Sequence, residues 1–174
     1  MALAHLSAHP ALGGGDRREE FLGHLGDETR ALIDGGIEPE RWYAEAHHLA
    51  LYEAAVATLD LQTDQACFRF FHDAQRKALT SSKRTSIHTL SALLAQTPVR
   101  WRRGHDTGHL SVGKRSSTGV EAVLRDHPFA EERVYRLVVL GGVAALLSDI
   151  VTVKEAIAER SGTHRARLHL RWKR

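Results

Sequence analysis

The stretch Arg165-Ala-Arg-Leu-His-Leu-Arg-Trp-Lys173 alternates basic side chains with small or apolar ones at every position. Successive side chains of a β-strand point to opposite faces of the sheet, so this alternation predicts a strand with one apolar face and one basic face. The apolar side chains would line a core, and the basic ones would meet water or a partner. The C-terminus is therefore predicted to be an integral strand of the fold.

Helical periodicity dominates the N-terminal half of the chain. Apolar residues three or four positions apart predict helices that begin near Asp16, Pro39 and Thr63, followed by a shorter helix through Leu90. Gly35-Gly36 is predicted to end the first of these helices.

The period changes from helical to strand-like at Pro98. Val99 and Trp101 alternate with Arg100 and Arg102, which predicts a first strand. Turn-forming residues then separate this strand from two more, near residues 110–112 and 120–124.

A long helix opened by Pro128 and a hairpin of residues 151–157 with the C-terminal strand complete the predicted order. We therefore predict an α+β fold, with N-terminal helices followed by an antiparallel sheet of about five strands, a long helix between the hairpins, and helices on one sheet face. Residues 1–15 are predicted to be a flexible lead-in, and residues 16–174 a single domain.

Composition is that of an ordinary globular protein. The chain has 174 residues, a formal net charge of +3, 43% hydrophobic residues and a single cysteine, Cys67. One cysteine can form neither an intrachain disulfide nor a cysteine metal cage, and no signal-like segment opens the chain, so we expect a cytoplasmic location. The apolar run 137–147 is about half as long as the roughly 20 residues of a membrane helix, and is predicted to be a buried core helix.

Residues 98–172 carry features of a known superfamily: Glu121-Ala-Val-Leu at the end of a hairpin, Pro128-Phe129 before a helix with Gly141-Gly142, and Ala158-x-x-x-Gly162-x-x-x-Ala166 before Trp172. This region resembles the bacterial vinyl-reductase-type domains and the related TRAPP-like and haem-nitric-oxide-binding folds, and more loosely a paralogous family of myxobacterial proteins of unknown function. The resemblance implies a small sensory, ligand-binding or adaptor domain that often works as a dimer.

The chain departs from these relatives at their functional motifs. Ala158 and Ala166 stand where the vinyl-reductase-type family has cysteines, which argues against a cysteine metal or redox site. The Tyr-x-Ser-x-Arg signature of the haem-binding relatives does not occur anywhere in the sequence, so the resemblance does not imply haem, and no cofactor is predicted.

Aromatic residues on the predicted helices could line a cavity for a small apolar ligand, and the same residues could equally be ordinary core. The predicted ligand-binding residues are Trp42, Tyr52, Phe68 and Phe71. Gly141-Gly142 would allow a close approach of another backbone, or leave space for a ligand or a dimer partner.

Basic residues of the predicted strands could share the open sheet face and contact an acidic protein or phosphate, or could simply be solvated. The predicted partner-binding residues are Arg100, Arg102, Arg165, Arg167 and Arg171. Because Trp101 and Trp172 fall on the apolar side of their strands, no exposed aromatics accompany the arginines, and a protein partner is favoured over nucleic acid.

Histidines offer a third hypothesis, a His-dependent metalloenzyme that uses His47, His48 and His72. Adjacent histidines point about 100° apart on a helix, so solvated positions explain this pair more simply. His105-Asp106-Thr107-Gly108-His109 reads as a turn, and no common catalytic motif occurs.

Taken together, these features favour a non-enzymatic regulatory or adaptor domain that forms a homodimer and binds a protein partner or a small apolar ligand. A nucleic-acid-binding protein and a metalloenzyme are the alternatives.

Overall fold

The computed structural model describes residues 6, 9–38, 43–81 and 89–173. The chain divides into two compact units, Met1–Cys67 and Phe68–Arg174. Helix α5 (Asp64–Ser81) begins in the first unit and continues in the second. Leu6 and Leu12, within the predicted lead-in, are both buried. The lead-in and the single domain over 16–174 stay predictions.

The first unit contains helices α2 (Gly15–Gly23), α3 (Asp27–Asp34) and α4 (Glu45–Thr58). The prediction of one continuous helix from Asp16 was wrong, because the chain breaks at Gly26, whose extended backbone forms the N-cap of α3. Helix α4 packs against both α2 and α3, and the Thr29 hydroxyl lies 2.9 Å from Nδ1 of His47 between α3 and α4.

The second unit is built on an antiparallel sheet. Its strands are β1 (His109–Arg115), β2 (Gly119–Arg125), β3 (Thr152–Gly162) and β4 (Arg165–Lys173), in the spatial order β1-β2-β4-β3. Helix α7 (Arg133–Leu147) connects the two hairpins. The predicted α+β class, the order of elements and the helix between hairpins are confirmed.

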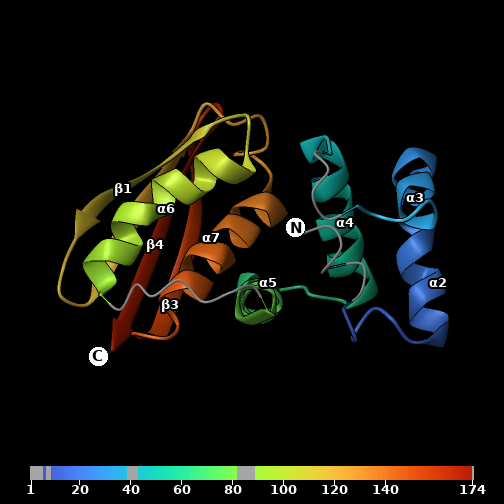
Figure 1. Ribbon diagram of the computed structural model, residues 1–174, viewed down its shortest axis with the longest axis horizontal. Coiled ribbons are helices and arrows are strands. Elements are labelled where there is room, and N and C mark those ends of the chain that lie inside the picture. Colours follow the sequence, from blue (N-terminus) through green and yellow to red (C-terminus); the bar gives the residue numbers. More distant parts are fainter. Residues whose placement is uncertain (1–5, 7–8, 39–42, 82–88, 174) are drawn as a thin grey trace. The chain divides into compact units, whose positions relative to one another are not determined.

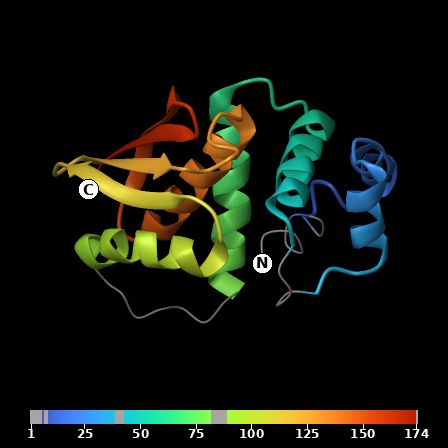
Figure 2. The same cartoon turned by 90° about the horizontal axis from the view of Figure 1, so that it is seen from above.

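Helices α6 (Leu90–Gly104) and α7 cover one face of this sheet, as Figures 1 and 2 show. Toward them, β4 presents its apolar side chains, which are at most 3% exposed: Ala166, Leu168, Leu170 and Trp172. The alternation in β4 therefore produces the predicted arrangement: the apolar side chains are buried on one face of the sheet, and the basic side chains lie on the other.

The predicted strand at residues 99–102 was wrong. These residues lie in α6, which continues through Pro98, so the described residues form four strands. The buried positions Leu90, Leu93, Leu94, Thr97 and Trp101 fall at helical spacing along α6. Burial of this stripe outweighs both the alternation of Val99–Arg102 and the lost backbone hydrogen bond at Pro98.

The apolar run 137–147 forms the buried part of α7, which confirms the predicted core helix. Among the described residues, no helix has both the length and the apolar character needed to span a bilayer.

Candidate ligand-binding site

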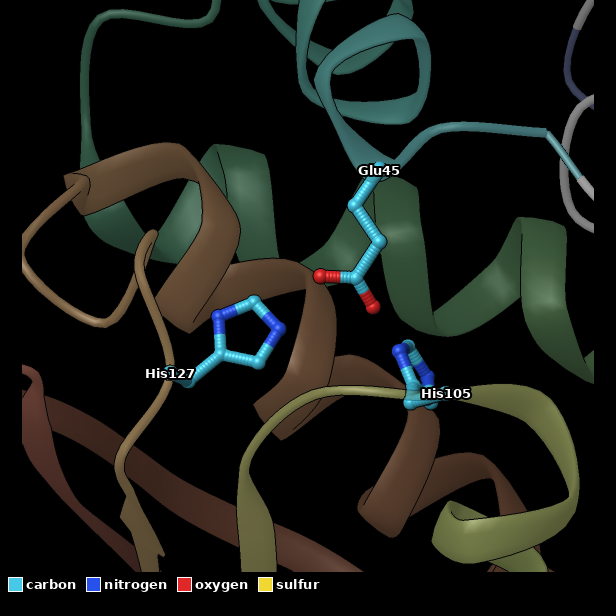
Figure 3. A group of neighbouring side chains, drawn as sticks. All are labelled: Glu45, His105 and His127. Carbon is cyan, nitrogen blue, oxygen red and sulfur yellow. The ribbon is translucent and has the colours of Figure 1, made fainter.

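Two histidine rings lie near each other in the second unit (Figure 3). His105 caps the C-terminal end of α6, and His127 follows β2 in the turn that leads to α7. Their nearest ligand atoms are within 4.8 Å of one another. His127 is fully buried, whereas His105 is half-buried. Glu45, also drawn in Figure 3, is the first residue of α4 in the first unit.

Hydrogen bonds fix the tautomer of His127. Its Nδ1 accepts the backbone N–H of Phe129 at 3.2 Å, which places the ring proton of the neutral imidazole on Nε2. Nε2 lies 2.9 Å from the hydroxyl of Tyr135 and therefore donates to it. The Tyr135 hydroxyl can in turn donate toward Nδ1 of His105, which lies 3.5 Å away. A directed chain thus runs from His127 through Tyr135 to His105.

Trp101 holds the His105 ring in place. The two rings stack with centroids 3.7 Å apart and planes within 6°. The indole N–H donates to the carbonyls of Thr107 and Gly108, at 3.3 and 3.2 Å. Gly108 has a φ of +68°, and a Cβ there would lie 2.8 Å from the His127 side chain, so only glycine allows this loop to close on the histidine.

The cluster consists of His105, His127, Tyr135 and Trp101. An imidazole pair can hold a transition metal, or can donate and accept hydrogen bonds to a polar group of an organic ligand. The flanking rings of Trp101, Phe129 and Tyr135 supply apolar walls. The sequence showed His105 only as part of a turn, and gave no signal for His127 or Tyr135, because the three residues converge only after α6, β2 and α7 have packed.

The predicted aromatic ligand residues fall in different parts of the chain. Trp42 lies outside the described residues. Tyr52 is buried on α4 in the first unit, where burial and, secondarily, the charge of Glu45 raise its pKa. Phe68 and Phe71 are buried on α5 in the second unit. A ligand pocket that these residues would share stays a prediction.

The predicted basic surface is only partly on the sheet. Arg165, Arg167 and Arg171 lie on the face of β4 opposite the helices, as predicted. Arg100 and Arg102 lie on helix α6, so their placement on the sheet was wrong. A role of these five arginines in partner binding stays a prediction.

Acidic residues of neighbouring strands interrupt the charge of this face. Glu155 lies 3.3 Å from Arg171, Glu159 pairs in register with Arg167, and Glu121 lies 3.9 Å from His169. The strand pairing therefore places carboxylates beside the cations of β4, which lowers the positive potential that a phosphate backbone would meet.

The histidines of the metalloenzyme hypothesis have other neighbours. His47 lies beside Thr29 in the first unit, and His48 is half-buried on the same helix, 6.5 Å from Tyr52 between ring centroids. His72, in the second unit, lies beside Ser148 and Asp73. A shared metal site for His47, His48 and His72 stays a prediction.

Sequence comparison with family models and with curated proteins finds no match. The structure, however, is similar to solved H-NOX proteins. An Fe(II) unliganded H-NOX protein from K. algicida is 12% identical with a TM-score of 0.63, and the similarity covers 99% of this chain and 95% of that one. At this identity, the similarity establishes the fold.

Two further H-NOX structures are similar to this chain over nearly its whole length. One, from work on haem distortion in the H-NOX family, has 10% identity, a TM-score of 0.56 and coverage of 99% and 94%. The other, from work on H-NOX activation, has 10% identity, a TM-score of 0.52 and coverage of 99% and 95%. The expected likeness to haem-nitric-oxide-binding folds is thus confirmed, while the vinyl-reductase, TRAPP and myxobacterial likenesses stay predictions.

Proposed function

We propose that this chain is a regulatory domain that binds a small ligand beside His105 and His127 in its second unit. The observation that carries the proposal is the directed chain His127–Tyr135–His105, in which a fully buried histidine is held in one tautomer and aimed through a tyrosine at a half-buried one. A few converging polar groups within apolar walls are typical of sites that bind a small ligand.

Haem is the group that the H-NOX structures suggest, but the residues of this chain match it only in part. His105 supplies an imidazole of the kind that holds haem iron. His127 already uses both ring nitrogens, on the Phe129 amide and the Tyr135 hydroxyl. The Tyr-x-Ser-x-Arg signature is absent from the whole sequence. The residues do not fit haem, and the proposed ligand is a small, largely apolar molecule with one polar group directed at His105.

Native mass spectrometry of the protein purified from its own host tests this function. We expect a retained small-molecule mass that is lost in His105→Ala and kept in the matched variant His109→Ala, because His109 is an exposed residue at the start of β1. Ligand binding would be contradicted if the protein retained no such mass and if no member of a metabolite library raised its melting temperature. Haem added to the purified protein should show no change in its absorption band.

A second candidate function is contact with an acidic protein in the cytoplasm, through the solvent face of β4. It is favoured by the exposure of Arg167 and Arg171 on that face. Poly-glutamate serves as a probe, and its binding should weaken in the double variant Arg165→Glu/Arg167→Glu but not in Arg100→Glu/Arg102→Glu on α6. If both double variants lost the same binding affinity for poly-glutamate, the net charge of the protein alone would explain the binding. Preferential binding of single-stranded DNA, steeply weakened by salt, would favour the nucleic-acid alternative. We also propose that the chain forms a homodimer.

A further inference from the structure

The sheet face opposite α6 and α7 is organised in rows of side chains that run across the strands. Strand pairing places each basic residue of β4 on this face beside residues of β2 and β3. In three rows one of these neighbours is acidic: Arg171 lies beside Glu155, Arg167 beside Glu159, and His169 beside Glu121. The basic side chains of these rows therefore each have a carboxylate neighbour.

The row at the end of this face has no carboxylate. The register of β2 with β4 continues to the last residue of β2, Arg125, and the first residue of β4, Arg165, which lie side by side. His109 of β1 pairs with Arg125, and Gly162 of β3 pairs with Arg165. Among the residues that the structure describes, neither arginine forms an ion pair. We call His109, Arg125 and Arg165 the end row.

The end row carries two unfavourable features. Cross-strand neighbours have Cβ atoms about 4.5–5.5 Å apart, so two arginines in these positions repel each other and destabilise the sheet. In addition, Nε of Arg165 and Oγ of Ser161, at the end of β3, are buried without a hydrogen-bond partner within the described ranges. Both features would be relieved by an anion bound to the two guanidinium groups, because it would cancel their repulsion and accept their N–H groups.

A phosphate monoester has the charge and the shape that the end row requires. It carries about −1.5 to −2 charges at pH 7 and three acceptor oxygens. Each guanidinium carries one positive charge and a planar fork of N–H donors that fits two oxygens of a phosphate. Two adjacent guanidinium groups therefore match one phosphate dianion, whereas a carboxylate would neutralise only one of them. The exposed imidazole of His109 supplies a further N–H donor beside Arg125.

The surroundings of the end row favour a single phosphate group carried by a protein. Arg125 and His109 are exposed and Arg165 is half-buried on an open sheet face, so a partner can reach the row and add contacts of its own. A nucleic acid would present a line of phosphates, and the neighbouring rows would meet that line with carboxylates.

We propose that Arg125 and Arg165, with His109 beside them, bind the phosphate group of a phosphorylated protein. This rests on the second candidate function, in which the solvent face of β4 contacts a partner, and it names the chemistry of that contact. It also changes the residues involved. Arg125 and His109 join the binding surface, whereas Arg171 is engaged by Glu155 at 3.3 Å.

Thermal unfolding of the full chain tests the phosphate site. Inorganic phosphate should raise the melting temperature above its value in sodium chloride of equal ionic strength. Arg125→Gln should lose this gain, yet without phosphate it should melt no lower than wild-type protein, because a repelling charge has been removed. Arg171→Gln is the matched control and should keep the gain. An equal gain in chloride, or a gain that persists in Arg125→Gln, would overturn the proposal.

Nuclear magnetic resonance gives a second measurement that needs no variant. Addition of inorganic phosphate to the wild-type chain should shift the Nε–H signals of Arg125 and Arg165 and leave that of Arg171 unchanged. Shifts of similar size at all three arginines would mean general screening and would overturn the site.

A phosphoserine peptide flanked by glycines identifies the source of the phosphate. It should bind at least about tenfold more tightly than the unphosphorylated peptide, the effect of one charged hydrogen bond, and Arg125→Gln should remove the difference. Tighter binding of single-stranded DNA than of the phosphopeptide to the end row would overturn the assignment to a protein. Poly-glutamate binding without any effect of phosphate would overturn the phosphate site alone, whereas no binding of either probe would overturn the second candidate function as well.

Discussion

The hydroxyl oxygen of Tyr135 lies 2.9 Å from Nε2 of His127, and the two side chains are only 2% and 0% exposed. Tyr135→Phe removes the acceptor of this buried N–H. It should lower the free energy of unfolding by about 1–3 kcal/mol, measured by urea denaturation. Tyr43→Phe is the matched control, because the Tyr43 hydroxyl accepts the Glu38 amide at an exposed position. Equal losses in the two variants would contradict a special role for the buried bond.

Gly141→Ala should destabilise the second unit although alanine is the better helix former. The gain in helix propensity of about 1 kcal/mol is outweighed by the contact of the new Cβ with the α5 backbone at 3.0 Å, and overpacking of this kind costs about 1–3 kcal/mol. Gly23→Ala at the end of α2 is the control, since a Cβ there meets nothing within 4 Å. A Gly141→Ala chain with an unchanged or higher melting temperature would refute the close helix contact.

Pro98→Ala should stabilise the protein. Pro98 lies in the interior of α6, where a proline lacks the N–H that would donate to the Leu94 carbonyl. Restoring that bond should raise the free energy of unfolding by up to about 3 kcal/mol in the same denaturation experiment. Val99→Ala, at an exposed neighbouring position of the helix, should change stability little. Destabilisation by Pro98→Ala would mean that the bend imposed by proline is needed for packing.

Tyr52 should make the fold sensitive to alkaline pH. Burial, and secondarily the charge of Glu45, raise the pKa of the Tyr52 phenol above its ordinary value. Above a pH of about 10 the unfolded chain therefore releases this proton while the folded chain retains it, so stability falls as pH rises, by up to about 1.4 kcal/mol per pH unit. Urea denaturation at increasing pH should show a steeper loss for wild-type protein than for Tyr52→Phe. Parallel losses would exclude Tyr52 as the cause.

Part of the fold was predictable because its signal is local. The alternation in β4 and the long apolar stretch of α7 each indicate their own element, since the side chains of one segment decide which face is buried. Trp101 shows the limit of such patterns. Its alternation with arginines suits a strand, but Trp101 also continues the helical stripe of Leu93, Leu94 and Thr97, and only packing against the sheet selects the helix.

The side-chain contacts of the histidines His72, His105 and His127 could not be predicted from local sequence patterns. His72 and Ser148 are 76 residues apart in the chain, and their contact depends on Gly141 admitting α5 to the surface of α7. His127 reaches His105 through Tyr135, and these three residues come from three different segments.

The sequence by itself therefore determined the α+β class, the order of elements and the apolar and basic faces of β4, because these follow from periodicity within a segment. The tertiary structure alone decided the helical state of residues 99–102 and the neighbours of His72, His105 and His127. Those outcomes depend on which segments pack together, because packing brings into contact residues that are far apart in the sequence and share no local pattern.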